Sequence, residues 1–301
     1  MRSPLTLLNN SQRVQTFNTK DLVNQWISRL SIDPFPFFCG VEEISKWKCL
    51  DSGLTFYYPV ECAGPEALYK ELRTHAWYYL QDKWEYDEAL TFLPRQGHLL
   101  EVGCGSGHFL RKAVRMNLRT EGLEMTMPDL SNPAVQDLSI SEASVQEHAE
   151  KYPGAYDIVC SFQVLEHVVD PRGFLEASVK LLAPGGKLLI STPNARSFLR
   201  HAFNILDMPP HHMTGWSEES YRFLQSILPV KLERVLYEPL ADYHIDYFVD
   251  TYSSRFNGKF DVRGAWARGA YGELSKRLLR AGGRRFFRGQ SMLAIFKKRE
   301  P

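Results

Sequence analysis

The strongest constraint on the fold is a run of three glycines that directly follows a short apolar segment. His98–Val102 has the composition of a buried strand, and Gly103, Gly105 and Gly107 come immediately after it. Glycine allows positive φ angles and lets a ligand approach the backbone without meeting a Cβ atom. The free N–H groups at the start of the next helix can also bind a ligand. The segment therefore predicts the ligand-binding turn at the carboxyl end of the first strand of an open α/β sheet.

A carboxylate stands where such a sheet would bind the ribose of a nucleoside. Arg119–Glu124 is predicted to be the second strand, and Glu124 ends it. A carboxylate at this position can accept hydrogen bonds from both ribose hydroxyls. The alternative is a tight turn followed by an unrelated surface glutamate. The ordered succession of strand, turn, helix, strand and acid favours the nucleoside site.

The spacing of the glycines narrows the choice of nucleotide. A dinucleotide fingerprint, G-x-G-x-x-G, would require a glycine where this chain has His108, and the third glycine stands one residue earlier, at Gly107. The pattern G-x-x-x-x-G-K-[ST] of a P-loop is absent from the sequence. The turn therefore disfavours both NAD and ATP as the bound nucleotide.

Strands and helices alternate through the rest of this region. Residues 171–182 are predicted to be a helix, because Asp170 can cap it and proline suits its first position. A turn at residues 183–186 follows, where Gly185 and Gly186 occur. Such alternation predicts a parallel sheet with right-handed crossovers. The further strands are predicted at residues 156–162, 187–192, 231–237 and 291–297.

The flanks differ from this central region. Residues 1–64 mix short apolar bursts with turn formers and are predicted to be an N-terminal extension. Residues 65–93 carry apolar side chains at helical spacing, which predicts a helix, and residues 65–94 are expected to act as a lid or linker. Residues 95–301 would then form the core, with an insertion at about 239–288 made of loops and one basic helix.

Taken together, these motifs resemble those of class I S-adenosylmethionine-dependent methyltransferases. Residues 99–107 resemble the first motif of that family, residues 156–159 its fourth-strand motif, and residues 182–188 the motif after the next helix. The resemblance covers roughly residues 95–240. It implies a Rossmann-like α/β fold: a seven-stranded, mostly parallel sheet with helices on both faces, whose last strand is antiparallel beside the sixth. It also implies S-adenosylmethionine as the cofactor.

The resemblance assigns roles to individual residues. The glycine turn would lie against the methionine part of the cofactor, and Glu101 would orient its amino group. Glu124 would hold the ribose, with Met125 beside the adenine and residues 144–146 at the adenine edge, although no aspartate stands at the usual adenine-contact position. Phe162 would border the methyl-transfer site. The predicted cofactor-binding residues are Glu101, Gly103, Cys104, Gly105, Gly107, Glu124, Met125 and Phe162.

Methyl transfer is an in-line displacement, so the protein chiefly has to align the nucleophile and remove its proton. Histidine is a natural base for a hydroxyl acceptor. His167 follows the predicted fourth strand, and His211 and His212 follow the fifth, at the same edge of the sheet as the glycine turn. We therefore expect His167 or His212 to deprotonate the acceptor. The alternatives are a helix start at Glu166 and a proline-anchored turn at the later pair.

The Glu-His pair also resembles the segment found in ubiquinone-pathway O-methyltransferases and small-RNA 2′-O-methyltransferases. In the RNA enzymes a glutamate, a Glu-His pair and a later histidine bind a divalent metal. This chain has Gln163 where the extra glutamate would stand, which leaves Glu166, His167 and His212. Three such ligands can suffice for a catalytic metal, but the departure at Gln163 leads us to predict that the site holds none.

Two further clusters have open interpretations. An aromatic group precedes the core on the predicted helix, and it either covers the cofactor as a lid or packs in the core. A basic run at residues 276–288 is either a solvated helix face or a contact for anionic lipid, a phosphorylated acceptor or RNA. The aromatic residues are Trp77, Tyr78, Tyr79, Trp84 and Tyr86.

Composition limits the partners. The formal net charge is +1, so no overall field marks a nucleic-acid binder, and no run of about eighteen apolar residues indicates a transmembrane helix. The cysteines form no C-x-x-C pair, and residues 1–20 lack the pattern of a signal peptide. These features predict a cytoplasmic protein without disulfides or a zinc knuckle. Its oligomeric state is not predicted.

The acceptor is the least constrained part of the prediction. Residues 47–59 resemble the leaders of some bacterial methyltransferases that modify sugars and glycans. We expect methylation of a hydroxyl on a small metabolite, a sugar or a lipid-linked glycan. One alternative is a catalytically silent cofactor-binding subunit that serves as a partner or scaffold. Another is a nucleic-acid methyltransferase, which is disfavoured by the low net charge and the lack of an Asn/Asp-Pro-Pro-Tyr/Phe motif after the fourth strand.

Overall fold

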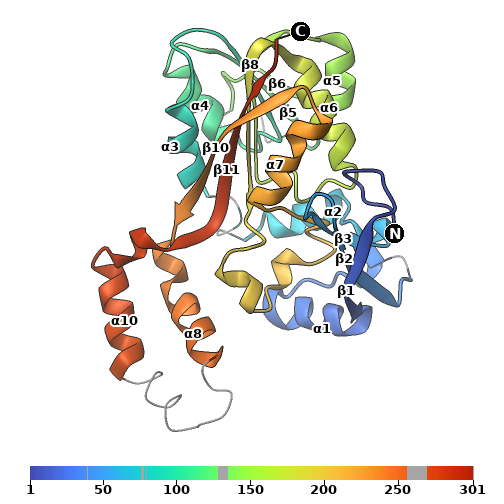
Figure 1. Cartoon of the computed structure of the whole chain (residues 1–301), viewed down its shortest axis with the longest axis vertical. Coiled ribbons are helices and arrows are strands. Elements are labelled where there is room, and N and C mark those ends of the chain that lie inside the picture. Colours follow the sequence, from blue (N-terminus) through green and yellow to red (C-terminus); the bar gives the residue numbers. More distant parts are fainter. Residues whose placement is uncertain (39, 76–77, 79, 128–134, 256–269, 301) are drawn as a thin grey trace.

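The computed structural model describes residues 1–300 except for 39, 76–77, 79, 128–134 and 256–269, and a seven-stranded sheet forms its centre (Figure 1). The strand order is β10-β11-β8-β7-β4-β5-β6. Neighbours from β8 to β6 pair in parallel, whereas β11 is antiparallel to both β8 and β10. This confirms the predicted Rossmann-like sheet. The strands are β4 (His98–Val102), β5 (Arg119–Glu124), β6 (Ile140–Glu142), β7 (Tyr156–Phe162), β8 (Leu182–Pro193), β10 (Val230–Pro239) and β11 (Arg288–Lys298).

Helices cover both faces of this sheet because successive strand residues point to opposite sides. Leu100 and Val159 lie in one apolar cluster, and their neighbours Leu99 and Cys160 lie in another. The first cluster packs against α5 (Val145–Lys151), α6 (Pro171–Leu181) and α7 (Glu218–Ile227), and the second against α3 (Trp84–Leu90) and α4 (His108–Val114).

The N-terminal residues form a second, antiparallel sheet in the order β1-β2-β3-β9. Its last strand, β9, comes from far along the chain, immediately after the His211-His212 pair. An apolar cluster joins Trp26 and Tyr57 of this part to Met208 and Met213. The extension is therefore packed against the later histidine segment, which the sequence did not reveal. Its elements are β1 (Ser11–Asn18), α1 (Thr19–Leu30), η1 (Phe35–Phe38), β2 (Glu43–Cys49), β3 (Thr55–Tyr58), η2 (Val60–Cys62) and β9 (Thr214–Gly215).

The single helix predicted over residues 65–93 is wrong. The structure has α2 (Glu66–Leu72) and α3, and Lys83 before α3 has an extended backbone with φ −121° and ψ 144°. The two helices bury side chains in different places. Leu68 and Leu72 join the N-terminal cluster, whereas Tyr86 joins a cluster of the central sheet. The chain has to change direction between them, and apolar spacing alone does not report this.

The turn predicted at residues 183–186 is also different. Strand β8 already begins at Leu182, and Gly185 has a φ of 72° within it. The pairing with β7 shifts register here, since Tyr156 faces Leu182 but Ile158 faces Lys187. The extra residues therefore form an irregularity within a continuous strand, and glycine supplies the left-handed backbone that this irregularity needs.

The insertion between β10 and β11 contains two helices in its described part, where one basic helix was predicted. Figure 1 shows α8 (Ile245–Arg255) and α10 (Ala270–Arg280) side by side, projecting away from the central sheet. Asp246 of α8 binds Lys276 and Arg280 of α10 at 3.1 and 2.7 Å.

No described helix is long and apolar enough to cross a membrane. Short 3₁₀ turns lie at η3 (Phe198–His201), η4 (Ile205–Asp207), η5 (Asp242–His244) and η6 (Gly283–Phe286).

Candidate active site

A large cavity opens at the carboxyl ends of β4, β5 and β7 and has a volume of about 1210 Å³. One part of its wall is the glycine turn with the residues after β5, β6 and β7. The other part comes from the histidine segments and from the root of the helical insertion. The predicted cofactor residues that line the cavity are Gly103, Cys104, Gly105, Glu124, Met125 and Phe162.

At two positions of the glycine turn there is no room for a side chain. Gly103 has a φ of 75°, and a Cβ atom there would lie 2.4 Å from Cγ2 of Val164. Gly107 has a φ of 68°, and its Cβ would lie 2.3 Å from Cδ1 of Leu138. Both the left-handed backbone and the close packing require glycine. The glycines of this pattern thus stand where the backbone turns tightly next to the cavity.

The carboxylate of Glu124 is fixed against this turn. The backbone N–H of Gly105 donates to its Oε2 atom at 2.7 Å, and the N–H of Met125 donates to Oε1 at 3.2 Å. Arg73 lies 3.7 Å from the same Oε1 atom. These contacts hold the carboxylate at the cavity wall, where ribose hydroxyls would meet a fixed acceptor. Met125 itself is 68% exposed and also lines the cavity.

Two of the predicted cofactor residues, Glu101 and Gly107, do not line the cavity, and Glu101 is buried beside it. The side chain of Glu101 is only 1% exposed. Its Oε2 atom has no hydrogen-bond partner among the described residues. Burial raises the pKa of this carboxyl well above its usual value. Burial therefore favours the protonated form of Glu101 at the end of β4, and its contact with the amino group of a cofactor stays a prediction.

The residues that end β7 form a rigid corner of the cavity. The ring of Phe162 packs against Phe109 and Tyr86, with centroids 4.6 and 5.2 Å apart. Gln163 has a φ of 58°, a conformation that costs energy for a residue with a side chain. Its Nε2 atom donates to Oε1 of Glu85 at 3.1 Å, which fixes the amide. Glu85 lines the cavity, and sequence analysis did not single it out.

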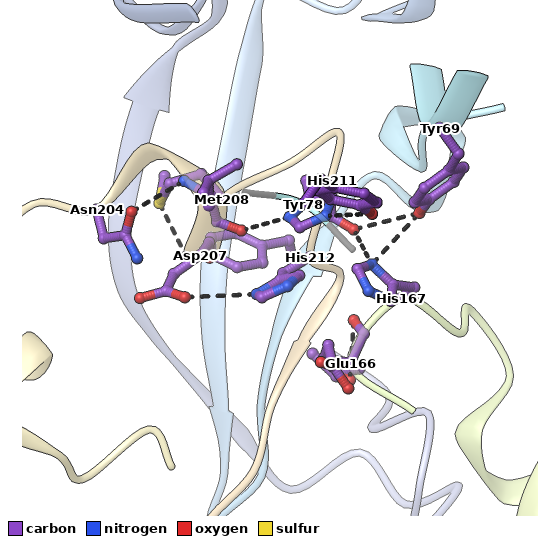
Figure 2. A network of polar contacts seen from close by, with 12 residues as sticks. Tyr69, Tyr78, Glu166, His167, Asn204, Asp207, Met208, His211 and His212 are labelled. Carbon is purple, nitrogen blue, oxygen red and sulfur yellow. Dashed lines mark hydrogen bonds and ion pairs between the residues drawn. The ribbon is translucent and has the colours of Figure 1, made fainter. Parts of the chain in front are cut away.

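Three histidines that line the cavity lie close together (Figure 2). The rings of His211 and His212 stack with centroids 4.4 Å apart, and His167 lies 4.6 and 4.8 Å from them. The predicted bases His167 and His212 are thus close together. His211, which was noted only as part of the same pair, lies between them and Tyr78.

The hydrogen bonds of these rings fix which nitrogen can accept a proton. Nδ1 of His167 lies 2.7 Å from the carbonyl oxygen of His211, and Nδ1 of His211 lies 2.8 Å from that of Leu206. A carbonyl only accepts, so both Nδ1 atoms carry the proton and both Nε2 atoms are acceptors. The hydroxyl of Tyr78 donates to Nε2 of His211 at 3.0 Å. In His212, Nδ1 lies 3.5 Å from Oδ1 of Asp207, close enough for an ion pair when the ring is charged, but no hydrogen bond joins the two atoms.

Burial sets the charge of these side chains. It lowers the pKa of His167 to about 4, and it lowers the pKa values of His211 and His212 well below their usual value. Burial also raises the pKa of Glu166 to about 8 and that of Asp207 to about 6. At neutral pH the three imidazoles are uncharged and can accept protons, while Glu166 keeps its own.

The comparisons with known proteins agree with this architecture. Residues 73–228 match a family described as "Methyltransferase domain". The chain belongs to this family. With the glycine turn and the seven-stranded sheet, the match makes it a class I S-adenosylmethionine-dependent methyltransferase.

Curated relatives of this methyltransferase match about a third of its length. The ubiquinone biosynthesis O-methyltransferase of Sodalis glossinidius is 36% identical over 103 residues, which are 32% of this chain and 41% of that protein. The protein of the same name from Cronobacter sakazakii is 36% identical over 109 residues, 34% of this chain and 45% of that one. The chain thus spans less than half the length of these relatives.

A solved structure with a TM-score of 0.50 shares the fold at low sequence identity. A chain of a complex containing the Haloferax volcanii Trm112 methyltransferase activator superposes with a TM-score of 0.50 and 18% identity, covering 72% of this methyltransferase and 90% of that chain. An S-adenosylmethionine-dependent methyltransferase from Archaeoglobus fulgidus is 19% identical, with a TM-score of 0.48 and coverage of 70% and 90%.

Helix α1 and strand β3 of the N-terminal extension hold the histidine segment in place. The indole N–H of Trp26 donates to the carbonyl of Pro209 at 3.3 Å, and the backbone N–H of Tyr57 donates to that of Met213 at 3.0 Å. The N–H groups of Met213 and Thr214 in turn donate to the carbonyl of Glu166 at 2.8 and 3.0 Å. The two histidine segments are therefore tied to each other and to the N-terminal sheet.

The histidine cluster offers one potential metal site among the described residues. One ligand atom from each of His167, His211 and His212 lies within 4.8 Å of the others. In a tetrahedral site with bonds of about 2.0 Å the ligand atoms stand roughly 3.3 Å apart. Closing the cluster around a metal would also displace Tyr78 from His211. We therefore derive no step through a metal, and the predicted absence of one stays a prediction.

The aromatic residues before the core divide between two roles. Tyr78, Trp84 and Tyr86 line the cavity, and Tyr86 also belongs to a core cluster. Trp77 and Tyr79 lie outside the described residues. Tyr69, which sequence analysis did not select, places its hydroxyl 3.4 Å from Nδ1 of His167. An aromatic residue one turn after the start of a short helix carries no local signal for such a contact.

Proposed function

We propose that this protein transfers the methyl group of S-adenosylmethionine to a hydroxyl group of a small-molecule acceptor. The observation that carries the proposal is the group of three neutral histidines in the same cavity as the glycine turn. A neutral imidazole beside the methyl donor can take the proton that a hydroxyl loses when it is methylated. The relatives named ubiquinone biosynthesis O-methyltransferases support attack by oxygen.

In the proposed mechanism the cofactor supplies an activated methyl group, and the protein aligns and deprotonates the acceptor. His212 is the preferred base, because the carboxylate of Asp207 lies beside its Nδ1 atom and stabilises the imidazolium that forms. His167 is the alternative base, held in the correct tautomer by the carbonyl of His211. A proton transfer concerted with methyl transfer does not require a strongly basic imidazole, since the hydroxyl becomes acidic as its oxygen is methylated.

The wall around the histidines indicates the kind of acceptor. Tyr69, Tyr78 and Tyr243 line this part of the cavity together with Leu206. Aromatic and aliphatic surface suits a ring or chain that carries the reacting hydroxyl, and tyrosine hydroxyls can bind its other polar groups. The proposed acceptors are a small metabolite, a sugar or a lipid-linked glycan. A cytoplasmic location is also part of the proposal, in line with the absence of a C-x-x-C pair from the sequence.

The proposal is tested by product formation from radiolabelled S-adenosylmethionine with a panel of acceptors. The panel contains catechols and other phenols, sugars, lipid-linked glycans, primary amines and short RNA. Label on the oxygen of a phenol or sugar, unchanged by a chelator, is the expected result. Cofactor binding without turnover on any acceptor would favour a silent subunit, and label on RNA or on nitrogen would replace the proposed acceptor.

The pH dependence of the reaction should also depart from that of an ordinary histidine base. Because burial disfavours the charged ring, the histidines stay neutral below their usual pKa. We expect kcat/KM to be level through pH 6.5 and to fall only at more acidic pH. The measurement uses saturating cofactor and an acceptor that does not titrate in this range. If half of kcat/KM were already lost at pH 6.5 or above, the buried histidines would not be the base.

A further inference from the structure

The outer surface of the helical insertion exposes large apolar side chains. Leu274 and Leu278 of α10 are 52% and 62% exposed, and Phe286 of η6 is 89% exposed. The two leucines stand four residues apart and therefore share one face of the helix. The opposite side of α10 is occupied, since Lys276 and Arg280 bind Asp246 of α8. The apolar face of α10 thus points away from α8.

The same segment concentrates positive charge. Residues 276–288 contain six basic residues and no acidic one, although the formal net charge of the whole chain is only +1. Arg277, Arg285 and Arg288 are exposed. Exposed cationic and large apolar side chains therefore occur together along this segment. We call the exposed side chains the α10–η6 surface, which consists of Leu274, Arg277, Leu278, Arg285, Phe286 and Arg288.

The insertion that carries the α10–η6 surface begins and ends beside residues that line the active-site cavity. The cavity is lined by Tyr243 and His244 of η5, which directly precede α8, and by Glu238, Gln290 and Ser291 near the ends of β10 and β11. Figure 1 shows the helical pair leaving the sheet at this point. Whatever binds the α10–η6 surface is therefore brought to the acceptor side of the cavity.

We propose that the α10–η6 surface binds peripherally to anionic lipid bilayers. Leucine and phenylalanine side chains insert at the boundary between head groups and acyl chains, while arginines on the same surface contact the anionic head groups. Nucleic acid fits less well, because a phosphate backbone would leave Leu274, Leu278 and Phe286 in water. The proposal goes beyond methyl transfer and does not depend on the identity of the acceptor.

The test is sedimentation of the full chain with vesicles of phosphatidylcholine, alone or mixed with phosphatidylglycerol. We expect binding to the mixed vesicles and little to the neutral ones, weakened by salt. Replacing Phe286 with serine should lower the partition coefficient about tenfold, because it removes the most exposed apolar ring. Replacing Arg285 with glutamine should lower the partition coefficient about fivefold, because one cationic contact with the head groups is lost.

Two matched variants serve as controls. Leu8→Ser removes a leucine that is 57% exposed near the N-terminus, and Arg119→Gln removes an arginine at the start of β5 whose side chain is 74% exposed. Both should bind mixed vesicles as the natural chain does. Failure of the natural chain to bind mixed vesicles would overturn the proposal. The proposal would also be overturned if the control variants lost vesicle binding to the same extent, or if the protein bound short RNA in place of vesicles.

Discussion

Replacing Glu124 with alanine is expected to weaken the binding of S-adenosylmethionine by about a hundredfold or more. Each ribose hydroxyl that donates to a charged acceptor contributes about 1.5 kcal/mol or more, so losing both costs about 3 kcal/mol. The carboxylate is already fixed by the N–H groups of Gly105 and Met125, so it is in position before the ligand arrives. The measurement is isothermal titration of the purified protein with S-adenosylmethionine and, separately, with NADH.

Two further variants separate this effect from a general disturbance. Glu124→Gln keeps the shape of the side chain but removes its charge, and we expect an intermediate loss of about tenfold. Glu142 pairs with Glu124 in the sheet and is exposed, but it does not line the cavity. Glu142→Ala should therefore bind the cofactor normally. Unchanged affinity in Glu124→Ala, or binding of NADH, would contradict the assigned cofactor site.

Replacing His212 with asparagine is expected to lower kcat by about a hundredfold to ten-thousandfold, the usual range for loss of a general base. The affinity for S-adenosylmethionine should change little, because His212 is on the acceptor side of the cavity. Asp207→Asn should have a smaller effect, since Asp207 acts through the ring that it supports. If the two groups form one unit, the double variant should be no slower than His212→Asn alone.

His167→Asn and His201→Ala complete the series. A larger loss in His167→Asn than in His212→Asn would move the role of base to His167, whose Nδ1 atom is held by the carbonyl of His211. His201 does not line the cavity, so its replacement should leave kcat unchanged. Normal turnover in both His167→Asn and His212→Asn would reject histidine as the base and leave the cluster with a packing role.

The central sheet could be predicted because its signals are local. The inner strands are nearly continuous apolar runs, as in residues 156–162, and glycines follow β4 where the backbone is left-handed. The carboxylate of Glu124 was found because a parallel sheet places the ends of neighbouring strands together. These features depend on residues close in sequence or on the general geometry of such a sheet.

The acceptor side could be predicted only in part, because distant segments build it. His167 and His212 were both proposed, but their approach depends on backbone hydrogen bonds from Met213 and Thr214 to Glu166. Strand β9, which makes part of this link, is only two residues long and has no periodicity to detect. Asp207 was missed for the same reason, since nothing beside it in the sequence marks it as a partner of His212.

The pairing of β9 with the N-terminal sheet bears on how substrate preference in this protein could be exchanged or inherited. The segment that matches the family, residues 73–228, omits β1, β2 and β3. A chimera made from that segment alone would carry the cofactor turn but would lose Trp26 and Tyr57, which support the histidine segment. The smallest transplantable unit of specificity is therefore longer than the recognisable domain and begins in the N-terminal sheet.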